Sequence, residues 1–236
     1  MKASPLIYAG MYVQLLPPAV ALFARHRIGA PARWVALWCL LLFLEDMVGR
    51  AVAAAGFHNL WLTHVGAPVT GAVALWMLSL WHDGRTHRLA LRLAIPPFIV
   101  VSVALSVLVD SPTTFSLFVA PFHALVLLLA SLWTFLVRSA SEEGRPATRD
   151  WFWILAGVML YAGVSTAVQG VVAFVYGAGR DSLVLAVFSA RAGATILAFA
   201  AIAGGMLCRQ PPTHSGGPSW PPFSPSPSSW PGSRSP

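Results

Sequence analysis

Long apolar segments separated by short connections dominate this chain. Seven stretches carry few charges and have the length, about 17–25 residues, that a helix needs to cross a hydrocarbon core about 30 Å thick. We expect helices at 5–24, 34–55, 60–81, 93–109, 115–136, 152–175 and 183–207. Because a segment inside a membrane has to satisfy its own backbone hydrogen bonds, this pattern predicts an all-α polytopic membrane protein, a bundle of about seven transmembrane helices.

The composition agrees with a membrane protein and argues against a soluble one. Hydrophobic residues make up 57% of the chain and charged residues 10%, whereas soluble domains carry roughly a quarter charged residues. The net charge of +7 would suit nucleic acid, but the basic residues lie in short loops and not along one face. We therefore expect no nucleic-acid partner. Basic loops beside membrane helices attract lipid, and membrane lipids are the expected partners.

The basic residues also predict the orientation. Lys2 and Arg180 fall on one side of the predicted bundle, and eleven arginines fall on the other: Arg25, Arg27, Arg33, Arg85, Arg88, Arg92, Arg138, Arg145, Arg149, Arg209 and Arg234. Connections rich in lysine and arginine stay in the cytoplasm. The N-terminus is therefore expected outside and the C-terminus in the cytoplasm.

Two regions follow from the change in composition near Cys208. Residues 1–208 form the predicted transmembrane bundle, and residues 209–236 a Pro/Ser-rich tail, with nine prolines and eight serines in 211–236. Such a segment buries too little apolar surface to offset its ordering entropy. We expect a disordered cytoplasmic tail, either a docking segment for a proline-recognising partner or a spacer.

Polar residues within the predicted helices form one layer. At about 1.5 Å per residue, they fall roughly 6–15 Å below the outer surface, apart from Glu45 nearer the middle. Gln14 belongs to this layer, and the candidate ligand-binding residues are Glu45, Asp46, Arg50, His64, His123, Gln169 and Arg191. Charges inside a membrane are costly, so such groups usually face the bundle interior, pair with one another and mark function.

Two interpretations of this layer compete. In the first, Asp46 and Arg50 pair along one helix at i, i+4 spacing, and Glu45 pairs with Arg191. These pairs would lock two helices together. In the second, the same groups hold a ligand or a proton. The stripe Gly157, Tyr161, Ser165 and Gln169 recurs at i+4 spacing; packing accounts for its members except Gln169.

Three functions remain open, and the enzyme question stays undecided with no catalytic residue assigned. The leading hypothesis is a sensory or accessory membrane protein that binds a small molecule or lipid in an outward-facing polar cavity and signals to a cytoplasmic partner. A lipid-modifying intramembrane enzyme could use His64, His123 and an acid, a set that zinc accepts. The chain has no local metal motif, so no cofactor is predicted, and whether a metal binds is left open. A transporter or proton-coupled carrier could use Asp46, Arg50 and Arg191.

Two motifs carry a family resemblance. The run Asn59-Leu-Trp-Leu-Thr-His64 and the run from Phe152-Trp-Ile-Leu-Ala-Gly157 through Leu160-Tyr161 resemble a family of bacterial multi-helix membrane proteins with no assigned function. That family often has an acid six positions after the histidine, where this chain has Thr70. The resemblance implies a bundle of about seven helices in the bacterial inner membrane, and it supplies no activity.

Overall fold

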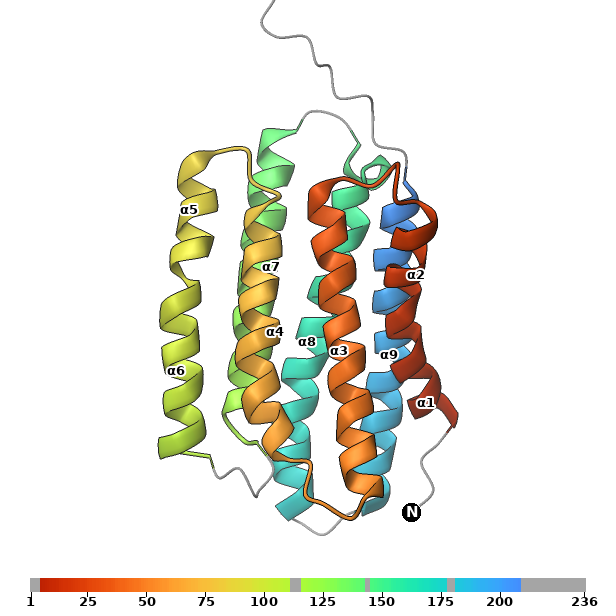
Figure 1. The fold of residues 1–236 in the computed structure, drawn as a ribbon, viewed down its shortest axis with the longest axis vertical. Helices are drawn as coiled ribbons and strands as arrows, with labels where there is room; N and C mark the ends of the chain where they lie inside the picture. The colour runs from red at the N-terminus through yellow and green to blue at the C-terminus, as the bar shows by residue number, and fades with distance from the viewer. Residues whose placement is uncertain (1–4, 111–115, 143–144, 178–180, 209–236) are drawn as a thin grey trace, which may run out of the picture.

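The computed structural model describes residues 5–110, 116–142, 145–177 and 181–208, and these residues form helices and connections without any strand (Figure 1). The helices are α1 (Pro5–Tyr12), η1 (Val13–Leu15), α2 (Leu16–Phe23), α3 (Ala30–Ala54), α4 (Trp61–Ser79), α5 (Arg85–Leu93), α6 (Ile95–Leu108), α7 (Val119–Ser141), η2 (Pro146–Thr148), α8 (Asp150–Gly177) and α9 (Asp181–Leu207). The all-helical prediction is confirmed for this part of the chain. The predicted tail at 209–236 lies outside the described residues.

Six helical segments in the described residues are long and apolar enough to cross a membrane, as in a multi-pass membrane protein. They are Pro5–Phe23, Trp61–Ser79, Arg85–Leu108, Val119–Ser141, Asp150–Val172 and Leu183–Leu207. Helix α3 has 25 residues, but it carries Arg33, Glu45, Asp46 and Arg50. Its charges set it apart from the six, and three of them line the candidate site described below.

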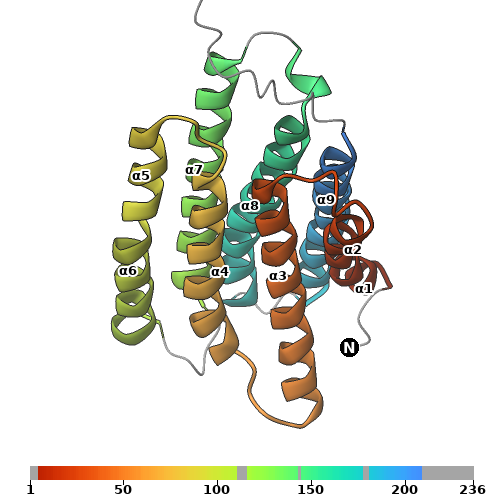
Figure 2. The ribbon, with the colours of Figure 1, turned by 45° about the horizontal axis from the view of Figure 1, so that its top comes forward.

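The helices run side by side along one axis (Figures 1 and 2). Helix α8 lies between α9 and α7, while α4 contacts α3, α6 and α7. The segment from α1 to α2 packs on α9 and α3. The core between α3, α8 and α9 is aromatic: the Trp38 ring stacks on Phe199 at 6.3 Å between centroids and meets Tyr161 edge-on at 5.7 Å.

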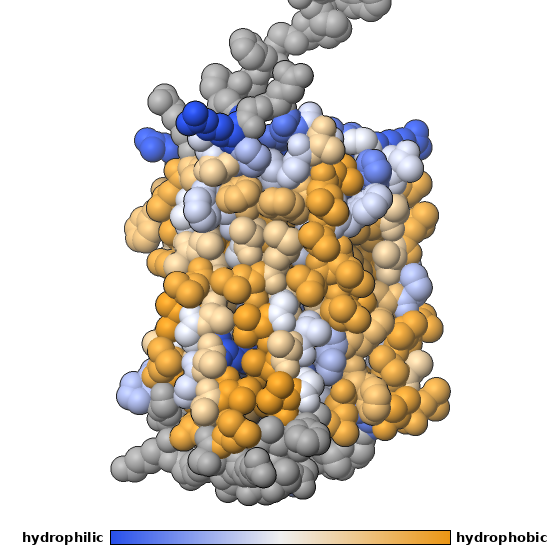
Figure 3. Space-filling view, turned by 180° about the vertical axis from the view of Figure 1, so that it is seen from behind, coloured by the Kyte–Doolittle hydropathy of each residue, from blue (hydrophilic) through white to orange (hydrophobic). Residues whose placement is uncertain are grey.

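The surface has an apolar middle and a basic end. Large apolar side chains point outward, and Val107 and Leu108 of α6 are 74% and 80% exposed. Figure 3 shows this apolar surface below a rim of hydrophilic residues at the end where α3 begins and α9 ends. We call this rim the basic end, because its loops and helix ends carry Arg25, Arg27, Arg33, Arg85, Arg88, Arg92, Arg138, Arg145 and Arg149.

The predicted helix 93–109 begins too late, because residues 85–93 form the helix α5. Leucine, alanine and arginine are strong helix formers. The three arginines lower the hydropathy of this segment, so it was not recognised as part of an apolar helix. Two of these arginines have partners: Arg88 donates to the His82 carbonyl at 2.7 Å, and the Arg92 guanidinium lies 4.3 Å from the Trp76 ring centroid. Pro96 and Pro97 cannot donate backbone hydrogen bonds, and α5 ends just before them.

The predicted helix 115–136 is displaced toward the C-terminus. Helix α7 runs from Val119 to Ser141 because the buried Asp110 carboxylate caps its first turn. The backbone N–H groups of Leu117, Phe118 and Val119 donate to Asp110 at 3.1–3.2 Å. This acceptor comes from the preceding connection, nine residues before Val119, so a local capping pattern does not reveal it.

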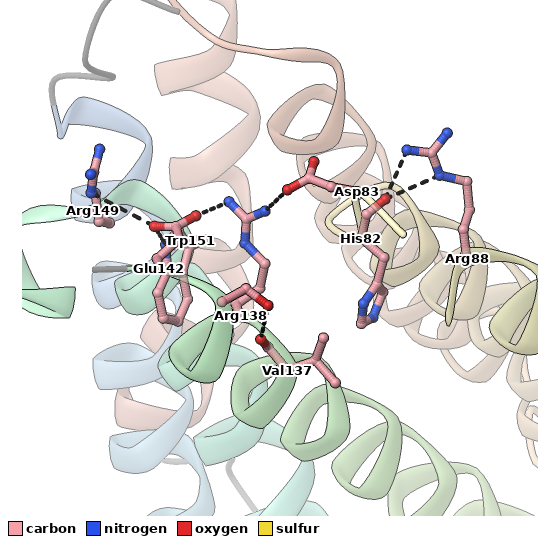
Figure 4. A network of polar contacts seen from close by, with 9 residues as sticks. His82, Asp83, Arg88, Val137, Arg138, Glu142, Arg149 and Trp151 are labelled. Carbon is pink, nitrogen blue, oxygen red and sulfur yellow. Dashed lines mark hydrogen bonds and ion pairs between the residues drawn. The ribbon is translucent and has the colours of Figure 1, made fainter. Parts of the chain in front are cut away.

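An ion-pair network joins three segments at the basic end (Figure 4). Arg138 of α7 donates to Asp83, in the α4–α5 connection, at 2.7 Å and to Glu142. The other Glu142 oxygen accepts from Trp151 Nε1 of α8 at 2.8 Å. Next to this network, burial lowers the pKa of the His82 imidazole, and His87 and Arg138 add to the effect. His82 is therefore neutral at neutral pH.

The close contact of α8 with α9 yields the first prediction. A methyl group added at Gly157 would lie 2.5 Å from the Ala198 carbonyl oxygen. This oxygen belongs to the backbone, so it cannot rotate away from the methyl group as the end of a side chain could. We expect Gly157→Ala to lower the free energy of unfolding by about 1–3 kcal/mol, the usual cost of overpacking. The measurement is thermal unfolding of the purified protein in mild detergent.

Gly163→Ala is the matched control on the same helix. Its nearest neighbour would be Leu128 Cδ1 at 3.9 Å, an ordinary contact. Alanine is favoured over glycine within a helix by roughly 0.5–1 kcal/mol, so this change should be neutral or stabilising. Equal effects of the two changes would contradict a special role for Gly157.

Candidate functional site

A cavity of about 380 Å³ lies among the helices, in the half of the bundle away from the basic end. Its walls come from α1, η1, α3, α4, α7, α8 and α9. Six of the seven predicted site residues line it: Glu45, Asp46, Arg50, His123, Gln169 and Arg191. The structure therefore brings together, from four helices, most of the polar layer inferred from the sequence.

A break in the first helical segment positions Gln14. Pro17 and Pro18 lack an N–H, so the carbonyls four residues earlier have no α-helical partner, and the chain forms the short 3₁₀ turn η1. Gln14 in this turn is only 5% exposed, and its Nε2 donates to Asp46 Oδ2 at 2.8 Å. This bond fixes the amide, and the Gln14 Oε1 atom is then a buried acceptor without a partner among the described residues.

Glu45 lies against the backbone of α4. A methyl group at Gly66 would come within 2.3 Å of the Glu45 carboxyl group, so a larger residue there would displace the end of the Glu45 side chain. Gly66 is one turn before Thr70, whose hydroxyl donates to the Gly66 carbonyl at 2.8 Å. Thr70 also lines the cavity.

The predicted ion pairs do not form. Within the described part of the chain, no salt bridge joins Asp46 to Arg50 or Glu45 to Arg191. The Arg50 guanidinium instead lies 4.7 Å from the ring centroid of Tyr8 in α1, a cation–π contact. Arg191 is close enough to act electrostatically on both carboxylates and on Tyr161. Two acids and two arginines thus share one cavity without pairing.

Several polar atoms around this cavity are buried and have no hydrogen-bond partner among the described residues. They are Gln14 Oε1, His123 Nε2, Ser165 Oγ and Gln169 Oε1. Native proteins rarely leave buried polar atoms unpaired, and each one calls for an explanation such as a ligand or water. Four such atoms lining a single space make this space suited to a polar occupant, either water or a ligand.

His123 is held rigidly in this wall. Its ring lies 6.2 Å from the Phe98 ring, between centroids, and a methyl group at Gly71 would come within 2.9 Å of His123 Cδ2. These contacts direct the imidazole from α7 towards the same space as the charges of α3 and α9.

His64 does not belong to the cavity. Its Nδ1 atom lies 3.3 Å from Ser106 Oγ of α6. The Ser106 hydroxyl donates its proton to the Ser102 carbonyl at 2.9 Å, so the His64 Nδ1–H has to be the donor between the two side chains. His64 thus links α4 to α6. Its assignment to the predicted ligand-binding layer is therefore corrected, because residues at the same depth can face different neighbours.

The metal set of the enzyme hypothesis is not assembled. Among the described residues, no group of three histidine, cysteine, aspartate or glutamate side chains is placed to hold a metal ion. His64 and His123 face different neighbours, Ser106 and Phe98.

Sequence reasoning assigned Tyr161 and Ser165 to helix packing, but both line the cavity. Gly157, at the start of the same stripe, packs against α9 as expected. The i+4 spacing of this stripe indicated a common face, but it did not indicate that part of this face lines a cavity. Thr63 and Thr195 also line the cavity, and no sequence signal distinguishes them from ordinary helix residues.

Comparison with known proteins adds nothing to this picture, since no protein-family model, curated protein or solved structure matches the chain.

The second prediction tests whether the cavity charges are paired. Because Glu45 and Arg191 face a space large enough for water and are not joined, we expect Glu45→Gln and Arg191→Gln each to cost less than about 1 kcal/mol of stability. Breaking a true buried pair typically costs about 3–5 kcal/mol. Thermal unfolding in detergent of both single variants and the double variant is the measurement.

The double variant supplies the control. Charges that are not paired should give a nearly additive double change, within about 0.5 kcal/mol. If each single change is strongly destabilising and the double change restores stability, the two side chains do form a structural pair, and the unpaired arrangement is wrong.

Proposed function

We propose that this protein is a sensory or accessory membrane protein with seven membrane-crossing helices that binds a small zwitterionic molecule from the outside. The observation that carries the proposal is the cavity of about 380 Å³, whose wall presents two carboxylates, two guanidiniums and four unpartnered polar atoms. Its volume lies in the range of small-molecule sites. Passage of a signal to a cytoplasmic partner is part of the proposal.

The opposed charges are the reason for choosing a zwitterion. Asp46, oriented by Gln14, and the Gln14 Oε1 acceptor would hold an ammonium group, which can only donate hydrogen bonds. Arg191, close to Tyr161, would hold a carboxylate or phosphate, which can only accept. A ligand with both groups would neutralise charges that the helices keep apart, and a ligand with one group would leave a buried charge unbalanced.

The proposed orientation rests on the basic end. Nine arginines gather there, and the positive-inside rule places such an end in the cytoplasm. Helix α3 would be the seventh crossing, because its ends lie level with those of its neighbours in the bundle (Figure 1). The cavity would then lie in the outer half of the membrane, with the N-terminus outside.

The two other hypotheses have less support. An intramembrane enzyme using His64, His123 and an acid lacks the common space those residues would need. A carrier built on Asp46, Arg50 and Arg191 would use the same cavity, but no observation distinguishes release to the second side from simple binding.

The third prediction concerns orientation. In a background carrying Cys39→Ala and Cys208→Ala, we expect His58→Cys, exposed in the α3–α4 connection, to react with an impermeant thiol reagent in intact cells. Thr86→Cys, exposed at the basic end in α5, should react only after permeabilisation. The reverse labelling pattern would overturn the orientation and place the cavity in the inner half.

The fourth prediction concerns the ligand. Native mass spectrometry of the protein purified in mild detergent should show a bound small molecule whose fragments contain both an amine and an acid. In Asp46→Asn and in Arg191→Gln, the affinity for this molecule should fall at least tenfold, since hydrogen bonds to charged groups are worth about 1.5–3 kcal/mol.

Arg85→Gln is the matched control, because it removes an exposed charge far from the cavity. It should keep the bound molecule. Loss in all three variants would indicate a general effect on the protein, and a bound molecule unaffected by the cavity variants would remove the cavity as its site. A molecule with one type of charge would refute the zwitterion while leaving the cavity as a binding site.

A further inference from the structure

A second hollow lies at the basic end, between α2 and α3. It is an open groove of about 590 Å³, and its apolar walls include Leu22, Leu37 and Leu40. Arg25, His26 and Arg33 stand around it. The groove has no residue in common with the cavity of the candidate site.

The two arginines are held together but not neutralised. Arg33 Nη2 donates to the Arg25 carbonyl at 3.2 Å, and Arg25 Nε lies 3.1 Å from His26 Nε2. Among the residues that the structure describes, neither guanidinium has a carboxylate partner. The remaining N–H groups of both side chains are thus available to an anion.

Other arginines of the basic end are used within the protein. Arg138 and Arg149 pair with acidic side chains of the network shown in Figure 4. Arg88 donates to a backbone carbonyl, and Arg92 lies over the Trp76 ring. The groove between α2 and α3 combines two guanidiniums that have no carboxylate partner among the described residues with an apolar wall.

We propose that this groove binds an anionic phospholipid, with the lipid phosphate on Arg25 and Arg33 and an acyl chain along α2 and α3. Basic pockets between helices at the cytoplasmic face suit anionic headgroups, and guanidinium groups bind phosphate through paired hydrogen bonds. The apolar wall continues onto side chains that face away from the protein: Leu22 is 74% exposed and Leu37 40%. A free phosphate would leave this apolar surface uncovered.

The test is native mass spectrometry of the full chain in detergent, titrated with phosphatidylglycerol or with phosphatidylcholine of the same acyl chains. Phosphatidylglycerol should bind more tightly to the unchanged protein. In Arg25→Gln/Arg33→Gln, its dissociation constant should rise roughly 10- to 30-fold, the effect expected for two arginines beside an anionic lipid. Phosphatidylcholine binding should change little.

A matched double variant separates this site from general attraction to a basic surface. Arg85→Gln/Arg145→Gln removes the same charge from two exposed arginines of the basic end outside the groove, and it should bind phosphatidylglycerol as the unchanged protein does. Equal losses in the two double variants would overturn the proposal. So would unchanged binding in Arg25→Gln/Arg33→Gln, or equal affinity for the two lipids.

A second variant tests the acyl chain and does not depend on the arginines. Leu22→Asn changes an exposed side chain, so the fold should persist, and phosphatidylglycerol should bind more weakly while glycerol 3-phosphate is unaffected. If glycerol 3-phosphate alone binds as tightly as the lipid, the groove is a phosphate site and the lipid proposal is wrong.

Discussion

Four charges placed inside an apolar bundle are the constraint on which the rest of this structure depends. An ionised side chain within the hydrocarbon costs several kcal/mol or more, so it has to face protein or water and not lipid. Glu45, Asp46, Arg50 and Arg191 all line one space between helices. Their neighbours meet this demand in different ways: an amide orients Asp46, an aromatic ring covers Arg50, and a glycine makes room for Glu45.

Close packing elsewhere makes that space possible. Gly157 and Gly205 bring α8 and α9 into backbone contact toward the basic end, where an added methyl group would meet carbonyl oxygens at 2.5 and 2.9 Å. At Gly10 in α1, an added methyl group would lie 3.0 Å from the Ala192 Cβ atom. The cavity wall between these contacts includes small polar side chains such as Ser165 and Thr195. These glycines thus set how closely the helices around the cavity approach one another.

Most of the helices could be predicted from the sequence, because membrane helices are recognisable by their length and hydropathy. The depth of the polar layer was also predictable, since a fixed rise per residue converts sequence position into depth. The rotation of each helix about its own axis could not be predicted. His64 lies at the depth of the layer but bonds to Ser106, and Arg50 turns to Tyr8 and not to Asp46 four residues away. Both outcomes depend on which helix stands beside which, and a single sequence with local spacing rules carries no such information.

Helix α3 connects the two proposed binding sites. Arg33 at its start borders the groove, and Asp46 lines the cavity, so the two lie about 20 Å apart along one helix. The segment from α1 to α2 runs beside it and also reaches both places: Gln14 holds Asp46, and Leu22 and Arg25 border the groove. A ligand that drew Asp46 and Arg191 together would pull on both of these segments, and the 3₁₀ turn at Gln14 is where the first of them can bend. If such a displacement altered the spacing of Arg25 and Arg33, occupation of the cavity and binding of an anionic lipid would be thermodynamically coupled, each changing the affinity for the other by the same factor.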